Sequence, residues 1–533
     1  MIVDLKSTPH KTPRLIVEGG LVINYKEQFN INAKLNIKID KLFDVNIYIK
    51  SNIKPVFRLF PVLLSALMIA ACAVGPDYSP PETTAPDGWR ADLEGGLSNR
   101  QTDVDALAQW WQTLNDPLLS YLVERAISEN LGVKEARAKI REARARRAIA
   151  MAGLFPTLDA TGSAKTNRTS EQVGVGRRTD LYQAGFDAGW EIDIFGGVRR
   201  SVEAATADMQ AMQEEYYDVM VSLTAEVALN YLDVRSFQAR LTVASSNLKV
   251  QEETSNITKW RYEAGLTTGL DVEQASYNLE ATRSEIPSLK TGLEQAKNRL
   301  AVLLGRQPGD IDPDLDKPGD IPVAGPEIAV GVPADALRRR PDVRMLEREL
   351  AAQTARIGVA KADLFPKLTL TGSIGLESLS SQDFLDAQSR YYNAGPGISW
   401  PIFRARAILQ NVEVQNALQE QKMIQYKASI LNALEEVENA MIAYSKEQEK
   451  RSSLLRAVQS ARAAAGLSQD QYSSGLVDFQ IVLEAQRSML SFEDQLTQSS
   501  RNVTADLIVI YKALGGGWTK ITSLEFPDTL EKK

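Results

Sequence analysis

The chain has 533 residues, 44% of them apolar and 24% charged, with a formal net charge of −7. This composition can bury a sizeable core and excludes a compositionally disordered chain. The acidic balance argues against a nucleic-acid partner, because phosphate binding needs a basic surface.

The first 71 residues differ from the rest of the chain. A basic stretch precedes an apolar run over 59–71, which is too short to span a bilayer and is typical of a secretory signal. Small residues then lead to Cys72, as in bacterial lipoprotein signals, so we expect a signal peptide and acylation of Cys72, palmitate included. The alternative is an ordinary buried cysteine. Residues 1 to about 50 are an unusual preface, and we expect the true translation start to lie downstream of them.

Removal of residues 1–71 would also limit the catalytic and metal-binding groups of the mature chain. It would leave 51 basic against 63 acidic residues, a net charge of about −12, and would take away His10, the only histidine. A mature chain with no His and one acylated Cys cannot build a Ser-His-Asp or Cys-His centre, or a zinc site with such ligands. We expect no enzymatic activity, no cofactor and no metal; carboxylate-only chemistry stays a distant alternative.

The first elements after the signal are helical. The Asp-Pro pair at 116–117 places a carboxylate at the N-cap and a proline at the first helical position, and a helical pattern with a break near Gly132 continues to Pro156. The period then changes to two. Apolar and polar residues alternate over 157–165 and 182–194, which predicts two strands, each with one apolar face.

Two long helices follow these strands. A helical pattern without proline covers 198–263, which corresponds to a rod of about 100 Å at 1.5 Å per residue. It ends at Gly265, and a second long helix returns over 271–304. Small residues are frequent along both rods, as in closely packed helices.

The second half of the chain repeats the first at a fixed offset of 210 residues. Leu-Phe-Pro at 154–156 returns at 364–366, and Trp190 returns as Trp400. This period is far longer than that of solenoid repeats, so one large unit is duplicated. The repeat predicts a helix start at 340–342, strands at 367–376 and 391–402, and long helices over about 403–473 and 479–514.

The four strands fit either a soluble half-buried sheet or a lipid-facing barrel with a wet lumen. Aromatic residues near strand ends and the long polar connections at 166–180 and 377–390 favour the barrel. Four strands cannot close, and an open edge in lipid leaves backbone groups unsatisfied, so closure must be shared between chains. Two chains give 8 strands and a filled interior, whereas three give 12 and suit the polar lumen face.

We therefore expect a mainly α fold with a transmembrane β-barrel. A duplicated unit would supply four strands per chain to a trimeric 12-stranded barrel, continued by a long periplasmic α-helical barrel. The expected divisions are a signal region with a spurious N-terminal extension (1–71), a lipidated N-terminal segment (72–115), a first repeat (116–310), a linker (311–338), a second repeat (339–515) and a C-terminal tail (516–533).

Four motifs resemble those of the outer-membrane factors of tripartite efflux systems, the TolC and OprM type, and in particular the lipoprotein OprM-like branch. They are CAVGPDY at 72–78, WEIDIFG at 190–196, RRPDV at 339–343 and WPIF at 400–403. The resemblance covers nearly the whole mature chain. It implies a homotrimeric transporter in outer-membrane lipid, lipid-anchored and extending into the periplasm, fed by an inner-membrane pump, RND type, through a periplasmic adaptor. Antibiotic resistance is the associated trait.

The resemblance also implies functional positions. The two helix-hairpin turns resemble the tips where the adaptor docks, although local geometry alone explains the glycines, which end helices at positive φ. The tip candidates are Arg261, Tyr262, Gly265 and Leu266 in the first turn, and Tyr472, Gly475 and Leu476 in the second.

Glu484 and Arg487, three residues apart just past the second tip, are the candidates for the aperture. In a threefold assembly, three copies of Glu484 would form an acidic ring that prefers cations and strains the closed state, unless Arg487 balances it. The alternative is a solvated ion pair between the two, worth a few tenths of a kcal/mol. Asp271 and Glu273, after the first tip, are weaker candidates.

Three other functions compete with small-molecule efflux. A protein-secretion exit duct of type I shares the architecture, and a lipid-anchored coiled coil without a pore would share the long helices. An enzyme is the most distant alternative. The sequence does not name the exported compounds, the pump, the adaptor or the resting state of the gate.

Overall fold

The computed structural model divides into two units, Met1–Cys72 and Ala73–Lys533. The residues that it describes are 14–17, 21–24, 73–82, 86–100, 103–173, 176–323 and 328–519. In the first unit, β1 (Arg14–Val17) pairs with β2 (Leu21–Asn24) in an antiparallel hairpin. The expected lipidation site, Cys72, lies outside the described residues.

The second unit begins its first repeat with two helices, α4 (Pro117–Glu129) and α5 (Leu131–Ala152). The carboxylate of Asp116 accepts hydrogen bonds from the N–H groups of Leu118 and Leu119 at 2.9 and 3.0 Å, so it is the N-cap that the sequence predicts. Asn130 caps α5 and separates the two helices. The matching helix of the second repeat is α10 (Pro341–Ala362).

One antiparallel sheet contains the four predicted strands. They are β4 (Thr157–Arg168), β5 (Arg178–Ile192), β7 (Lys367–Ser378) and β8 (Arg390–Ser399), in that order across the sheet. The strand expected to reach Ile402 ends at Ser399 instead, because Pro401 has no N–H to donate to a ladder and a short 3-10 turn follows. β4 and β8 are the two edges of this sheet.

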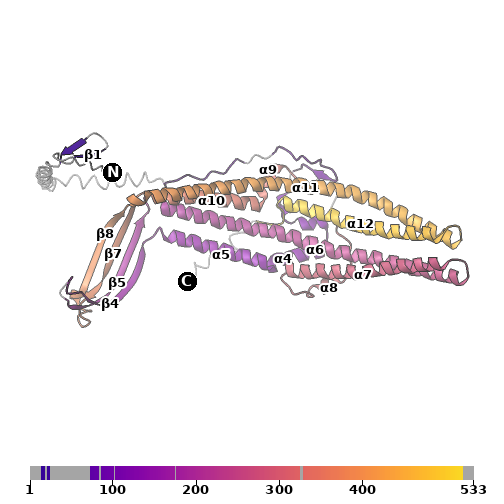
Figure 1. The fold of residues 1–533 in the computed structure, drawn as a ribbon, viewed down its shortest axis with the longest axis horizontal. Coiled ribbons are helices and arrows are strands. Elements are labelled where there is room, and N and C mark those ends of the chain that lie inside the picture. Colours follow the sequence, from indigo (N-terminus) through magenta and orange to yellow (C-terminus); the bar gives the residue numbers. More distant parts are fainter. Residues whose placement is uncertain are drawn as a thin grey trace, which may run out of the picture. The chain divides into compact units, whose positions relative to one another are not determined.

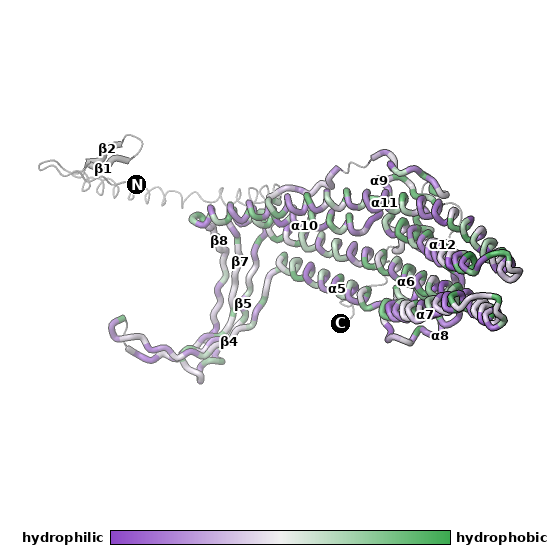
Figure 2. The backbone as a smooth tube through the Cα atoms, turned by 45° about the vertical axis from the view of Figure 1, so that its right-hand side comes forward, coloured by the Kyte–Doolittle hydropathy of each residue, from purple (hydrophilic) through white to green (hydrophobic). Residues whose placement is uncertain are grey.

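The long helices match their predicted extents closely. They are α6 (Gly197–Glu263) and α7 (Gly269–Leu303) in the first repeat, and α11 (Ala405–Ser473) and α12 (Phe479–Ala513) in the second. In the second unit, the sheet lies at one end of the helices and the turns α6–α7 and α11–α12 lie at the other (Figure 1). Apolar and polar residues are interleaved along these helices (Figure 2).

The helices that are connected to the strands lie side by side in the same order as the strands. α5 packs on α6, α6 on α10, and α10 on α11, as their strands do in the order β4, β5, β7 and β8. α7 packs on α6, and α12 packs on both α11 and α6. Among the described residues, no helix combines the length and the apolarity needed to cross a bilayer.

The largest core lies at mid-length of the helices. Trp110 is fully buried and stacks on Tyr511 of α12 with ring centroids 5.4 Å apart. The Tyr231 hydroxyl of α6 donates to the helix-capping Asp116 at 2.6 Å, which ties α4 to the long helix. Short elements surround this core: α3 (Val104–Ala108), α8 (Asp312–Leu315), α9 (Pro333–Arg339), and the parallel pair β3 (Leu97–Ser98) and β6 (Ile328–Ala329).

Candidate functional site

The two hairpin tips share one backbone geometry. Gly265 and Gly475 have φ values of 70° and 74°. In the first tip, the Gly265 N–H donates to the Tyr262 carbonyl at 2.9 Å and the Leu266 N–H donates to the Arg261 carbonyl at 2.8 Å, and the second tip repeats both bonds. A Cβ at either glycine would meet nothing within 4 Å, so positive φ, and not crowding, requires glycine.

The side chains of the two tips differ. Tyr262 is 53% exposed, whereas its equivalent Tyr472 is 3% exposed. Tyr472 packs against Phe479, with ring centroids 5.2 Å apart. Arg261 also lies over the Tyr472 ring, because its guanidinium is 4.7 Å from the ring centroid, and it donates to the Ser473 carbonyl at 3.1 Å. Tyr472 therefore stabilises its tip from inside. The docking surface that the sequence predicts at this tip can only be formed by neighbouring residues.

Exposed apolar side chains gather mainly on the first tip. Leu266 and Leu476, both predicted tip residues, are exposed at equivalent positions. The first tip adds Trp260 and Leu270, each 66% exposed, which sequence reasoning did not select. A large aromatic residue in an otherwise polar stretch beside a turn was the available signal for Trp260.

Asp271 serves the start of α7. It accepts from the Thr268 backbone N–H at 3.2 Å, while the Thr268 hydroxyl accepts from the Asp271 N–H at 3.3 Å, a reciprocal capping box. Burial opposes ionisation of Asp271, but hydrogen bonds from Thr267 and Thr268 outweigh it and lower the pKa. Its role in the helix cap explains the aspartate at position 271 without any role in an aperture. Glu273 is exposed.

Glu484 and Arg487 do not pair with each other within the described residues. The Arg487 Nε donates to Asn278 Oδ1 at 2.9 Å, and its guanidinium lies 5.2 Å from the Tyr277 ring centroid. Both partners belong to α7, so Arg487 joins α12 to α7, the second helices of the two hairpins. Glu484 is exposed and lines a groove of about 450 Å³ between α11 and α12, together with Ile481.

Polar contacts hold the second hairpin against α6. Arg240 on α6 forms a two-bond ion pair with Asp494 on α12, at 2.6 and 3.2 Å. Nearer the tip, the buried Gln486 side chain donates to the Thr254 hydroxyl at 2.9 Å. These contacts fix α12 to the first repeat along much of its length.

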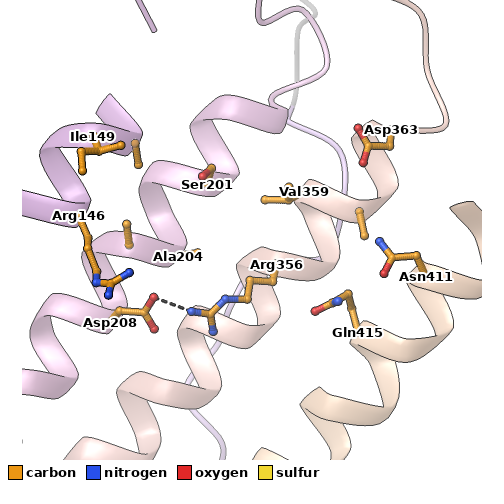
Figure 3. A pocket seen from close by; sticks show the side chains of 13 residues that line it. Arg146, Ile149, Ser201, Ala204, Asp208, Arg356, Val359, Asp363, Asn411 and Gln415 are labelled. Atoms are coloured by element: carbon orange, nitrogen blue, oxygen red, sulfur yellow. Dashed lines mark hydrogen bonds and ion pairs between the residues drawn. The ribbon is translucent and has the colours of Figure 1, made fainter. Parts of the chain in front are cut away.

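A second hollow lies near the sheet, over α5, α6, α10 and α11 (Figure 3). It measures about 540 Å³. Arg356 donates to Asp208 at 2.6 Å across it, and Arg146, Ser201 and Asn411 also line it. Such walls can hydrogen-bond a polar solute. Among the described residues, no group of three or more His, Cys, Asp or Glu could hold a metal ion.

Residues 73–78, called the strap here, are fixed between α6 and α10. The Val74 carbonyl accepts from the Arg200 Nε at 3.2 Å. Gly75 meets Gly358 so closely that a Cβ on Gly75 would lie 2.5 Å from the Gly358 Cα. The strap is therefore a fitted part of the helical layer immediately after position 72.

Comparisons with known proteins agree with this architecture. A model of the outer membrane efflux protein family matches residues 122–306 and 332–516. The chain is 33% identical over 470 residues to nodulation protein T of Rhizobium leguminosarum bv. trifolii, covering 87% of this chain and 98% of the relative. It is 29% identical over 467 residues to the toluene efflux pump outer membrane protein TtgF of Pseudomonas putida, with 86% and 96% covered. The solved outer-membrane channel OprN is 35% identical, with a TM-score of 0.79 over 84% of this chain and 100% of that one.

Proposed function

Because the chain belongs to the outer membrane efflux protein family, an outer-membrane family of transporters and not of enzymes, we propose that three copies form a passive exit duct for small molecules. Each copy contributes its four strands to a 12-stranded barrel, and its long helices extend the duct into the periplasm. The observation that carries this proposal is the four-stranded sheet with two open edges, continued by helices in the same order. An open sheet edge is costly in lipid, and shared closure removes it.

The duct receives its cargo from an inner-membrane pump of the RND type through a periplasmic adaptor. The relative TtgF, named for a toluene efflux pump, supports a small-molecule cargo. The adaptor meets the hairpin tips through exposed residues such as Tyr262, Leu266 and Leu476. Glu484 and Arg487 form the aperture just inside those tips, and acylated Cys72 anchors the chain.

Purification from outer membranes followed by two measurements tests this function. An SDS-resistant trimer that dissociates on heating, and ion conductance in planar bilayers, are the expected results. A monomeric particle without conductance would contradict the duct and favour a coiled coil without a pore. Crosslinking in cells, followed by identification of the captured proteins, separates an adaptor with an RND pump from the ABC exporter that a protein-secretion duct would use.

A further inference from the structure

The four-stranded sheet has two chemically different faces. Side chains alternate along a strand, and residues directly opposite each other on neighbouring strands share a face. Phe186 on β5 lies opposite Ile374 on β7, and these side chains are 54% and 63% exposed. On the other face, Asp187 lies opposite Asp159. In the proposed barrel the exposed apolar face therefore contacts lipid, and the polar face lines the lumen.

Aromatic side chains lie at both ends of the apolar face. Eight residues separate Tyr182 from Trp190, and eight separate Tyr392 from Trp400, which is about 26 Å along a strand. The tryptophans lie at the end of the sheet next to the helices, where the Trp190 indole donates to the Leu154 carbonyl at 3.0 Å. The tyrosines lie toward the other end, where the hairpin connections are (Figure 1). Two aromatic girdles about this far apart flank the lipid-facing band of outer-membrane barrels.

The charges of the apolar face lie at one end only. Within the four described strands, every charged residue on this face lies on the far side of the tyrosines from the helices. The four residues, called the outer rim here, are Arg168 on β4, Arg178 and Asp180 on β5, and Arg390 on β8. Three arginines and one aspartate give the outer rim a net charge of +2 in a chain whose net charge is −7.

Two of these arginines are directly opposite each other. Arg168 pairs in register with Arg178, so two like charges lie side by side and repel. The Arg168 Nε donates to the Gly176 carbonyl at 3.1 Å, and the Arg178 Nε donates to the Asp180 carboxylate at 3.3 Å. Within the described residues, neither guanidinium has a further partner. The Nη groups of both arginines are therefore available to an anion that would relieve the repulsion.

We propose that Arg168 and Arg178 bind a phosphate group of a phosphorylated glycolipid in the outer leaflet of the membrane. The planar fork of a guanidinium matches a phosphate group and can donate two hydrogen bonds to it. This proposal rests on the proposed function, because the apolar face meets lipid only when the sheet is part of a barrel.

The surface beside the arginines favours a lipid over a free anion. On β4, the positions of the apolar face between Arg168 and the helices include Ala164, Gly162 and Ala160. Their small side chains leave a shallow strip beside the larger Tyr182 and its neighbours on β5. An acyl chain can lie along this strip while the phosphate group of the same molecule meets the two guanidiniums. A free phosphate ion would use the arginines alone.

Titration of the purified trimer with lipids, followed by native mass spectrometry, tests the site. The probes are lipid A with its phosphate groups, the same lipid A after their removal, phosphatidylglycerol, and inorganic phosphate. Arg168→Gln and Arg178→Gln each remove one charge from the outer rim. The matched control is Lys165→Gln, which removes one charge from the polar face of β4, where Lys165 lies opposite Leu181.

Each outer-rim variant should bind phosphorylated lipid A about tenfold more weakly than unaltered protein, because a hydrogen bond between charged groups is lost. Lys165→Gln should bind it as unaltered protein does, and lipid A without phosphate should bind weakly to all of them. Equal binding by the outer-rim variants and the control would overturn the site. Equally tight binding of phosphatidylglycerol or of inorganic phosphate would overturn its assignment to a phosphorylated glycolipid.

Conductance of the same preparations separates this inference from the proposed function. Unaltered protein and all three variants should form trimers that conduct alike in planar bilayers. If they do and the lipid titration fails, the duct stands and only the lipid site is wrong. If unaltered protein forms no conducting trimer, the proposed function fails and the lipid site fails with it.

Discussion

Arg261 at the end of α6 covers the ring of Tyr472 at the end of α11, with 4.7 Å between the guanidinium and the ring centroid. This contact joins the two tips of one chain. The equivalent of Arg261 in the second repeat is Gln471, and the equivalent of Tyr472 is the exposed Tyr262. A guanidinium–ring clasp between one chain's second tip and the next chain's first tip is therefore not expected from equivalent residues.

We predict that Arg261→Ala loosens the contact between the two tips and so favours an open duct. A cation–π contact of this kind contributes about 1 kcal/mol, so the open fraction should rise several-fold. Conductance of the purified channel in planar bilayers, without adaptor, measures it. Tyr262→Leu is the matched control, since this exposed ring should leave conductance unchanged; equal leak from both variants would contradict a role for the clasp.

At the proposed aperture, Glu484→Gln combined with Arg487→Ala should increase passive leak. The main cause is loss of the Arg487 bond to Asn278, which joins α12 to α7. Glu484→Gln alone should instead reduce the preference for cations. Bilayer conductance with asymmetric salt, and sensitivity of cells to vancomycin, report the two effects. Unchanged closed-state conductance of the double variant would remove the gate assignment.

Alanine at the tip glycines should destabilise the hairpins. Gly265→Ala and Gly475→Ala force a side chain into positive φ, at a cost of about 1 kcal/mol each. Gly466→Ala, inside α11 with open space around its Cβ, should stabilise by up to about 1 kcal/mol. Thermal unfolding, followed by circular dichroism of the helices, compares the three variants. Destabilisation by Gly466→Ala would show that crowding by the added methyl group, and not positive φ, decides the effect of alanine.

Substitution of Gly358 on α10, against which the strap packs, should release the strap. In Gly358→Ala, the new methyl carbon would lie 2.8 Å from the Arg200 Cγ and 2.9 Å from the Val74 carbonyl oxygen. We expect faster proteolytic cleavage near the N-terminus with the helical core intact. Gly88→Ala, where a Cβ meets nothing within 4 Å, is the control. Identical cleavage of both variants would mean that the strap tolerates the methyl group.

Asp218 on α6 should make the fold less stable as the pH rises. Burial, followed by repulsion from Asp342, raises its pKa to about 6, compared with about 3.9 in an unfolded chain. The native state then holds the extra proton, so stability falls between about pH 4 and 6. Asp218→Asn should stabilise by about 2 kcal/mol at pH 7 and have little effect below pH 4. A pH-independent change in thermal midpoint would rule out this ionisation as the cause.

Much of the fold could be predicted from local sequence signals. Asp-Pro at 116–117, the change to period two after Leu-Phe-Pro, and Gly265 each act within a few residues, so the helices and strands lie close to their expected bounds. Strands differ from the expected bounds at some of their ends. The expectation continued the alternation through Pro401, beyond the end of β8 at Ser399, and it began the second strand at 182, whereas β5 starts at Arg178.

Contacts between repeats were harder to predict. Tyr262 and Tyr472 occupy equivalent positions, but Tyr472 meets Phe479 of its own repeat, where the first repeat has Gly269. The guanidinium of Arg261, from the other repeat, also lies over the Tyr472 ring. The partner of Arg487 likewise depends on α7 lying beside α12, so the ion pair with Glu484 considered from spacing alone does not form. Spacing along one helix carries no information about a neighbouring helix that competes for the same side chain.

The unlike tips have a consequence for assembly. A ring of three such chains would present six turns of two alternating kinds, one rich in exposed aromatic and aliphatic groups and one with its tyrosine hidden. Identical copies of a docking protein could not meet all six in the same way. The docking protein would occupy the six turns in two sets of three. The number of its copies bound per ring at limiting concentration would therefore differ from the number at saturation.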